Sequence, residues 1–265
     1  MNNKNKNDTS WQNIARWYKD VPKKKGGYHS TVLIPEILDK LKTYVKNNGK
    51  VLDLACGEGS VTNEIYQAGY KVVGVDLSND LIANAKHSFP DIHFFQEDAK
   101  NLSGGFLKFI DKVDAVVCVL ALQNIDDIDK VFEEVKKVLN PHGIFIFIIN
   151  HPYFRIPKST SWGFQGLEKQ YRIVEKYLSK IKIPILAHPG KQNSEISYSF
   201  HRPLQDYIKS LSRYGFTVID ITELISNKVS ENGKRADAEN LARKEIPMFM
   251  SVVAKNVVIR AKAGT

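Results

Sequence analysis

The sequence has few of the residues that build disulfide frameworks or metal centres. Only two of its 265 residues are cysteines, Cys56 and Cys118. Neither lies in a Cys-x-x-Cys pair or in a Cys/His cluster, which are the spacings that structural zinc sites and disulfide scaffolds use. We therefore expect neither a disulfide framework nor a metal site.

Long apolar runs are missing as well. No stretch approaches the roughly 20 apolar residues that a membrane-spanning helix needs. The chain starts Met-Asn-Asn-Lys-Asn-Lys, without the apolar segment of a secretory signal. These two features predict a cytoplasmic protein without a membrane partner.

Acidic residues are scarce except in one part of the chain. The net charge is +9, but residues 51–150 carry −7, whereas residues 1–50 and 151–215 carry +7 each. Basic flanks of this kind could attract an anionic substrate or a nucleic acid, or they could simply pack against an acidic core. The charge pattern leaves these interpretations open.

A glycine loop is the most informative feature that is present. Residues 50–59 read Lys-Val-Leu-Asp-Leu-Ala-Cys-Gly-Glu-Gly, which predicts a short buried strand, a tight turn and a helix that begins near Ser60. Such a loop lets a ligand approach the backbone closely. Asp53 at the end of the strand would repel a pyrophosphate and would favour a ligand that carries an ammonium group.

Two more acids follow at the ends of predicted strands. The strand over residues 71–76 ends in Asp76, and the strand over residues 92–96 runs into Asp98. An acid at the tip of the second strand of a nucleotide-binding unit can accept two hydrogen bonds from ribose hydroxyls. Asp98 taken alone could instead cap the turn that follows it.

The order of these features resembles the class I S-adenosylmethionine-dependent methyltransferases. The resemblance is carried by Asp53-x-Ala55-x-Gly57-x-Gly59 and then Asp76 and Asp98, and it is strongest over residues 48–150. It implies an α/β fold with a doubly wound, seven-stranded, mostly parallel sheet in the order 3-2-1-4-5-7-6. It also implies a lid inserted between strands 5 and 6.

The expected organisation is a disordered tail followed by one methyltransferase domain over residues 10–265. The tail covers residues 1–9. The expected parts of the domain are N-terminal cap helices over 10–47, a cofactor-binding core over 48–150, a lid and acceptor-site insertion over 151–202 and the rest of the sheet over 203–265. Within the insertion, the pattern predicts a helix over residues 170–181 and a strand over residues 194–200.

The resemblance implies S-adenosyl-L-methionine as the cofactor, S-adenosyl-L-homocysteine as the product and no metal. Asp53 would orient the methionine ammonium, Asp76 would bind the ribose and Asp98 would bind the adenine amino group. The other cofactor contacts expected on this basis are Ala55, Gly57, Gly59, Leu77, Ala99, Val119, Tyr18 and His29.

The acceptor is expected to be a small molecule, aromatic or acidic, because the insertion is rich in aromatic residues and contains Arg202. Tyr153, Arg202 and Gln123 are the candidate acceptor contacts. Positioning alone can supply most of the rate of methyl transfer. A general base is needed only when the acceptor loses its proton late, and His151 and His201 are the candidates for that role.

Other functions remain open at this point. The resembled enzymes closest in pattern are those of quinone biosynthesis, but no residue specifies a quinone. An RNA or protein methyltransferase could use the basic flanks, although Leu120-Ala-Leu-Gln123 stands where amino-group nucleic-acid methyltransferases carry Asn-Pro-Pro-Tyr. A cofactor-binding protein without catalysis is the remaining alternative, whereas Asp53 argues against a nicotinamide oxidoreductase.

Overall fold

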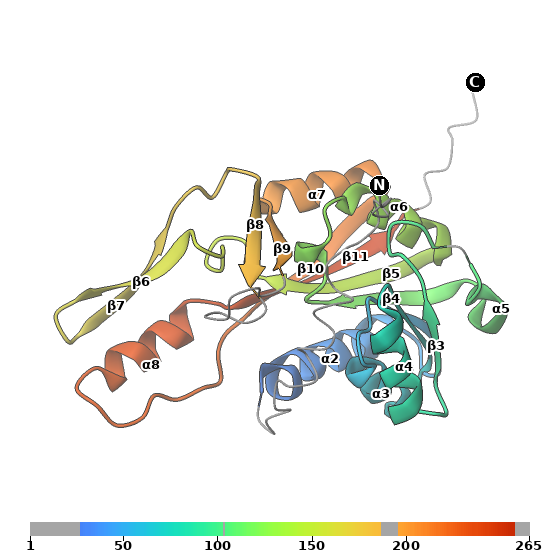
Figure 1. Ribbon diagram of the computed structural model, residues 1–265, viewed down its shortest axis with the longest axis horizontal. Coiled ribbons are helices and arrows are strands. Elements are labelled where there is room, and N and C mark those ends of the chain that lie inside the picture. The colour runs from blue at the N-terminus through green and yellow to red at the C-terminus, as the bar shows by residue number, and fades with distance from the viewer. Residues whose placement is uncertain (1–26, 103, 187–195, 258–265) are drawn as a thin grey trace, which may run out of the picture.

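A seven-stranded sheet forms the centre of the protein. The computed structural model describes residues 27–102, 104–186 and 196–257. The strands lie in the order β3-β2-β1-β4-β5-β11-β10, and only β11 runs antiparallel to its neighbours (Figure 1). Their bounds are β1 Lys50–Leu54, β2 Lys71–Asp76, β3 His93–Gln96, β4 Val113–Val119, β5 Leu139–Asn150, β10 Phe216–Leu224 and β11 Phe249–Asn256. The predicted strand order is confirmed, with β10 and β11 as the sixth and seventh strands.

The central strands are apolar throughout because both of their faces are covered. Successive residues of β1 alternate between two separate clusters of buried side chains. Leu52 and Leu54 belong to one cluster, together with Phe145 and Phe147 of β5, and Val51 belongs to the other. The sheet therefore has a hydrophobic core on each side.

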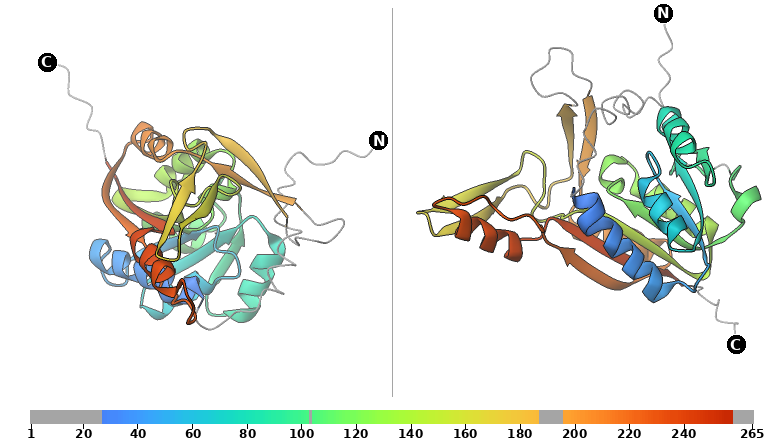
Figure 2. Two further views of the ribbon diagram at one scale, coloured as in Figure 1. Left: turned by 90° about the vertical axis from the view of Figure 1, so that its left-hand side faces the viewer. Right: turned by 90° about the horizontal axis from the view of Figure 1, so that it is seen from below.

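Helices cover both faces of the sheet, as Figures 1 and 2 show. One face carries α2 Ile34–Tyr44, α3 Ser60–Gln67 and α4 Asn79–Ser88, preceded by the short π-helix η1 His29–Leu33. The other carries α5 Leu107–Ile110, α6 Ile128–Val138 and α7 Leu204–Arg213. No helix within the described ranges is long and apolar enough to cross a membrane.

Local sequence signals explain where these helices begin. Asp127 precedes α6, and its side chain accepts a hydrogen bond from the Lys130 backbone N–H at 3.2 Å. Ser78 caps α4 in the same way through the Leu81 N–H. A side-chain oxygen at this position satisfies a backbone donor that the helix cannot pair itself.

The insertion after β5 consists of two hairpins. They are formed by β6 Thr160–Gln165 with β7 Lys169–Val174, and by β8 Ile181–Leu186 with β9 Ile196–His201. The helix predicted over residues 170–181 is therefore wrong. Tyr171 pairs across the hairpin with Gly163, and its ring occupies the space that a side chain at Gly163 would need.

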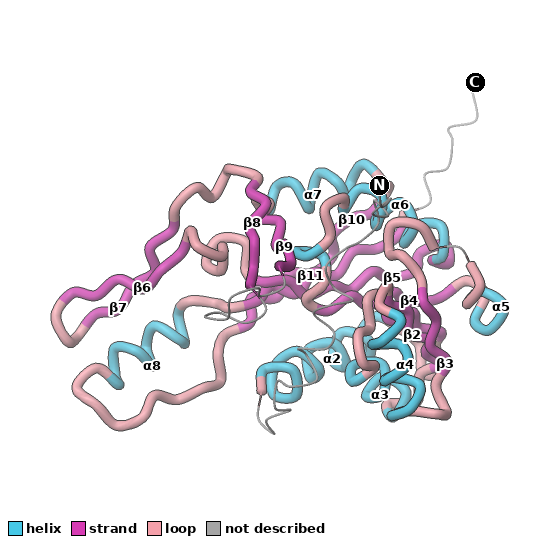
Figure 3. Tube along the Cα trace, viewed as in Figure 1, coloured by secondary structure: helices cyan, strands magenta, loops and turns pink. Residues whose placement is uncertain are grey.

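The hairpin β6–β7 extends away from the sheet together with α8 Ala236–Glu245, and Figures 1 to 3 show the two elements side by side. The Arg235 guanidinium lies 3.3 Å from the centroid of the Phe164 ring. This cation–π contact joins the start of α8 to the hairpin. The hairpin β8–β9 lies instead near the ends of β4 and β5, where its residues reach the loop after β4.

Candidate cofactor and acceptor site

The loop after β1 leaves room for a ligand beside its backbone. Ala55, Gly57 and Gly59 all have positive φ, at 58°, 57° and 78°. A Cβ at Gly59 would lie 2.7 Å from the Phe94 ring, so glycine is required there for packing. A Cβ at Gly57 would meet nothing within 4 Å. The space beside Gly57 is therefore open, as a cofactor cradle needs.

Asp76 at the tip of β2 holds this loop in place. Its Oδ2 accepts a hydrogen bond from the Gly57 N–H at 2.9 Å, and its Oδ1 accepts one from the Ser78 N–H at 2.8 Å. Each carboxylate oxygen can accept two hydrogen bonds. Asp76 thus keeps capacity for the two ribose hydroxyls that the sequence assigns to it.

Asp53 is a buried carboxylate that has no positively charged neighbour among the described residues. Its side chain is 1% exposed and accepts a hydrogen bond from the Thr62 hydroxyl at 2.6 Å. Burial raises the pKa of Asp53 to about 7; the Thr62 hydrogen bond opposes this shift and the charge of Asp76 adds to it. No Lys or Arg in the described parts of the chain lowers this pKa, so a cationic ligand fits the site better than an anion.

The remaining predicted cofactor residues lie along the same edge of the sheet. Asp98 follows β3 and is half-buried, and its Oδ1 accepts a hydrogen bond from the Lys100 N–H at 2.9 Å. Leu77 follows β2, Ala99 is buried beside Asp98, and Val119 ends β4. The contacts of these residues with a nucleotide stay a prediction.

Two further predicted cofactor contacts come from the N-terminal region, and their contact with a cofactor stays a prediction. Tyr18 lies outside the residues that the structure describes. His29 begins η1 and is exposed.

A small cavity lies beyond the carboxyl ends of β4 and β5, where the acceptor is expected. Its volume is about 20 Å³, which is room for one water-sized group. The side chains and backbone that line it come from the loop after β4, the end of β5 and the segment after it, β9 and α7: Gln123, Asn150, Pro152, Arg155, Pro157, Ser199, Phe200, His201, Arg202 and Tyr207. Three predicted residues, Gln123, His201 and Arg202, thus meet at one cavity.

His151 has both ring nitrogens engaged. It is 1% exposed, its Nε2 lies 2.8 Å from Glu223 Oε1, and its Nδ1 accepts a hydrogen bond from the Tyr153 N–H at 3.3 Å. Burial lowers the pKa of His151, against the opposing effect of Glu223. This arrangement joins the end of β5 to β10 and leaves no free nitrogen to act as a base. Tyr153 is 40% exposed and stacks on Tyr177 at 4.2 Å.

His201 keeps one nitrogen free. Its Nε2 lies 2.7 Å from the Tyr177 carbonyl oxygen, which can only accept, so this nitrogen carries the proton. Burial lowers the pKa of His201, and the neutral ring then has an unprotonated Nδ1. Because His201 also lines the cavity, its geometry suits a general base better than that of His151.

The Arg202 side chain is engaged in hydrogen bonds to backbone carbonyls. Its guanidinium is 8% exposed and donates to four carbonyl oxygens, those of Phe200 at 3.3 Å, Leu122 at 3.4 Å, Ile125 at 2.5 Å and Asp126 at 2.6 Å. These hydrogen bonds attach the end of β9 to the loop after β4. The predicted contact of Arg202 with an acidic acceptor stays untested.

Within the described ranges, the side-chain amide of Gln123 has a hydrogen-bond partner at its nitrogen but not at its oxygen. Its Nε2 donates to the Leu120 carbonyl oxygen at 2.7 Å. Its Oε1 is buried and has no hydrogen-bond partner within the described ranges. A ligand with an N–H or O–H group would satisfy it.

Sequence reasoning missed Arg155 and Asn150 as residues of this cavity. Arg155 lies in an irregular, proline-flanked segment, where no periodicity or motif indicates which side chains face inward. Asn150 is the last residue of a strand and is recognisable only by that position.

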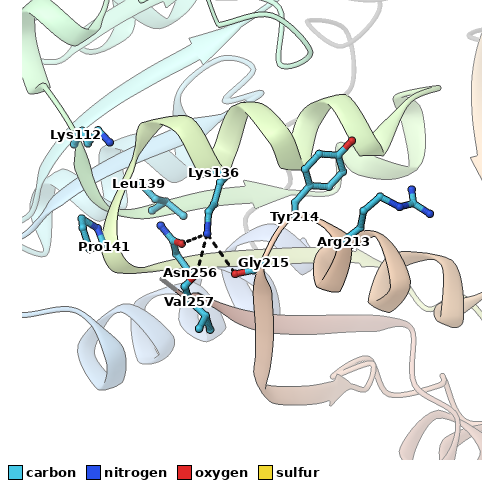
Figure 4. Close-up of a pocket in the computed structure, with 9 residues that line it drawn as sticks. All are labelled: Lys112, Lys136, Leu139, Pro141, Arg213, Tyr214, Gly215, Asn256 and Val257. Atoms are coloured by element: carbon cyan, nitrogen blue, oxygen red, sulfur yellow. Dashed lines mark hydrogen bonds between the residues drawn. The ribbon is translucent and has the colours of Figure 1, made fainter. Parts of the chain in front are cut away.

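A larger pocket lies at the opposite, amino edge of the sheet, away from the glycine loop (Figure 4). Its volume is about 550 Å³, and its lining includes Lys112, Arg213 and Lys136. The Lys136 Nζ already donates to the carbonyls of Val257, at 3.1 Å, and Gly215, and to the Asn256 side chain. In parallel sheets, ligands bind at the carboxyl ends of the strands, so this pocket is not the predicted cofactor site.

The fold and the acids together define a class of protein. An open, doubly wound sheet with a glycine loop after its first strand and acids at the tips of the next two strands is a cofactor-binding α/β domain. A family model described as "Methyltransferase domain" matches residues 52–147, which contain this loop and all three acids. The chain contains a domain of the class I S-adenosylmethionine-dependent methyltransferase superfamily, whose methyl donor is S-adenosyl-L-methionine.

Two curated relatives are similar to part of the chain. A demethylmenaquinone methyltransferase of Paenarthrobacter aurescens is 36% identical over 109 residues, or 41% of this chain and 42% of the relative. A ubiquinone biosynthesis O-methyltransferase of Haemophilus ducreyi is 32% identical over 143 residues, or 51% of this chain and 61% of the relative. The chain thus spans about half the length of these relatives.

A solved structure resembles most of the chain. An S-adenosylmethionine-dependent methyltransferase from Mesorhizobium loti has a TM-score of 0.61 and 25% identity, with 82% of this chain and 96% of the other covered. The similarity therefore extends well beyond residues 52–147.

Proposed function

We propose that this protein transfers a methyl group from S-adenosyl-L-methionine to a small-molecule acceptor. The observation that carries the proposal is the buried Asp53 beside Asp76, where the described part of the chain supplies no neighbouring cation and leaves open space at Gly57. A cofactor that carries both an ammonium and a sulfonium group supplies the missing positive charge. The names of the two quinone-pathway relatives support a small molecule as the acceptor.

The chain's own residues would act mainly by holding the two reactants. The cofactor would supply the methyl group from its sulfonium, and the thioether that remains is a good leaving group. The backbone near Gly57 and the Asp53 carboxylate would hold the methionine part, Asp76 the ribose and Asp98 the adenine. The hairpin β8–β9, attached through Arg202, would exclude water from the acceptor.

His201 would act as the base for an acceptor that has to lose a proton. Its Nε2–H is held by the Tyr177 carbonyl, so the proton would be taken up at Nδ1. This role belongs to a hydroxyl or protonated amine acceptor and is dispensable when the acceptor reacts without losing a proton.

Calorimetric titration tests the cofactor part of the proposal. We expect the protein to bind S-adenosyl-L-methionine and S-adenosyl-L-homocysteine but not NAD. Asp76→Ala should weaken the binding of both by about 1–3 kcal/mol, since it removes hydrogen bonds from ribose to a charged acceptor. Asp91→Ala, at an exposed acid, is the control. Binding of NAD instead, or unchanged affinity of the Asp76 variant, would contradict the proposal.

A further inference from the structure

We propose that the methyl acceptor is a small acid and that Arg155 binds its carboxylate. This inference rests on the proposed function, because it concerns the acceptor cavity of that same site. Arg155 lies five residues after the end of β5 and lines the cavity together with His201 and Gln123.

The Arg155 guanidinium has no hydrogen-bond or ion-pair partner among the described residues. In the parts of the chain that the structure describes, it makes no hydrogen bond and no ion pair, although its backbone N–H donates to the His151 carbonyl. Partial burial lowers the pKa of Arg155, so this charge is not that of a freely solvated surface residue. A partly buried cation without a partner is unfavourable for the folded protein unless a ligand balances it.

The other arginines near it are already occupied. Arg202 donates to backbone carbonyls. Arg172 donates to the Phe154 carbonyl at 2.8 Å and to the Thr160 hydroxyl at 2.6 Å. Both keep their charges, and the charge of Arg155 contributes to the lowered pKa of Arg172. Three positive charges, those of Arg155, Arg172 and Arg202, therefore lie in this region.

No acidic residue balances this charge within the cavity. Its lining contains two arginines, Arg155 and Arg202, and neither an aspartate nor a glutamate. Guanidinium and carboxylate match in geometry and can form two parallel hydrogen bonds. The two terminal nitrogens of Arg202 already donate four hydrogen bonds, whereas the Arg155 guanidinium donates none within the described ranges.

The more deeply buried residues of the cavity lining need a hydrogen-bond donor from the ligand. The His201 Nδ1 and the Gln123 Oε1 are both acceptors without a donor in the described ranges. Both residues are more than nine-tenths buried, whereas Arg155 is half-buried. An acid that also carries a hydroxyl or an amine would satisfy Arg155, His201 and Gln123 together. Its carboxylate would lie toward solvent and its reacting group inward. The small volume of the cavity admits only this terminal group.

Titrations with matched pairs of ligands test this inference. In the presence of S-adenosyl-L-homocysteine, hydroxybenzoates and α-amino acids are each compared with their amides, which have the same shape without the charge. We expect at least one acid to bind about tenfold or more tightly than its amide, as a charge-assisted pair predicts. Arg155→Gln should remove that preference, and Arg155→Lys should keep part of it.

Two outcomes would overturn the inference. One is a wild-type protein that prefers no acid over its amide, including the case in which no acid binds. The other is an Arg155→Gln variant that keeps the full preference. Arg213→Gln, an exposed arginine paired with Asp129, is the matched control and should keep it.

Two further measurements distinguish this inference from the proposed function and from a structural role of Arg155. If S-adenosyl-L-homocysteine binds but no acid is preferred, the inference fails and the proposed function stands; if the cofactor does not bind, both fail. Arg155→Gln should also melt at the wild-type temperature or slightly above it, because no partner is lost and a partly buried charge is removed. A large loss of stability in that variant would indicate a structural role and would count against ligand binding.

Discussion

At the scale of single residues, Asp53 shows how a folded protein can hold a group in an unfavourable state. The carboxylate is buried, and its pKa is raised to about 7. In the unfolded chain an aspartate has a pKa of about 3.9. Between these two pH values the folded protein binds more protons than the unfolded chain, so the free energy of unfolding contributed by Asp53 falls as the pH rises.

The first prediction follows from this pH dependence of the free energy of unfolding. Asp53→Asn removes the charge, and the new amide oxygen can still accept from Thr62. We expect the variant to melt at a higher temperature than the wild type at about pH 8 and to lose this advantage at about pH 4. The affinity for S-adenosyl-L-methionine should fall in the same variant. Thermal melts over a pH series, with Asp91→Asn as the control, measure the first effect; a difference independent of pH would contradict the argument.

The glycine loop was the part of the site that sequence could specify by residue. The positive φ of Gly59 is a requirement local to the strand–turn–helix unit, whereas the lack of room for a side chain comes from Phe94 of β3. The roles of His151 and His201 could not be distinguished in this way. The partner of His151 lies 72 positions along the chain, at Glu223, and that of His201 lies 24 positions away, at Tyr177.

At the scale of elements, Arg202 connects parts of the chain that are distant in sequence. It lies at the end of β9, and the carbonyls it binds at Ile125 and Asp126 are 77 and 76 positions away. These carbonyls lie in the loop between β4 and α6. The contact holds the β8–β9 hairpin against the edge of the sheet where the acceptor is expected.

Arg202→Gln should therefore destabilise the fold. The variant loses several charge-assisted hydrogen bonds and leaves buried and part-buried carbonyls without a donor, which we expect to lower the free energy of unfolding by about 2–4 kcal/mol. Urea denaturation measures the change. Arg213→Gln, which breaks an exposed ion pair, should lower it by about 1 kcal/mol or less. Similar losses in the two variants would show that Arg202 is not a structural clamp.

The β7 strand shows the limit of prediction from sequence at this scale. Residues 170–181 were expected to form a helix, because local pattern alone does not show that a partner strand lies beside them. The pairing of β7 with β6, and the position of Tyr171 over Gly163, depend on the turn between these strands. Strand pairing is tertiary information, whereas a helix forms its hydrogen bonds locally.

At the scale of the whole molecule, the cofactor edge collects residues from three neighbouring strands. Asp53, Asp76 and Asp98 come from the ends of β1, β2 and β3. A ligand that contacts all three ends should bind the folded chain and not the unfolded one. Its binding therefore stabilises the whole fold through mass action.

S-adenosyl-L-homocysteine at 100 times its dissociation constant should raise the free energy of unfolding by about 2.7 kcal/mol. Thermal melts with and without the ligand measure this as a higher melting temperature. NAD at the same concentration is the control and should cause no shift. Equal stabilisation by NAD would show that the carboxyl edge of the sheet accepts a pyrophosphate.

The sequence alone determined the apolar central strands, the glycine loop and the three acids, whereas the order of the seven strands came from the resemblance to the methyltransferases. These features depend on apolar runs buried on both sides of a sheet and on turns whose requirements lie within a few residues. Only the tertiary structure decided which histidine keeps a free nitrogen, that Arg202 is occupied by the backbone and that Arg155 is not. The reason is that a side chain's availability depends on its hydrogen-bond partners, and these come from segments that only folding brings together.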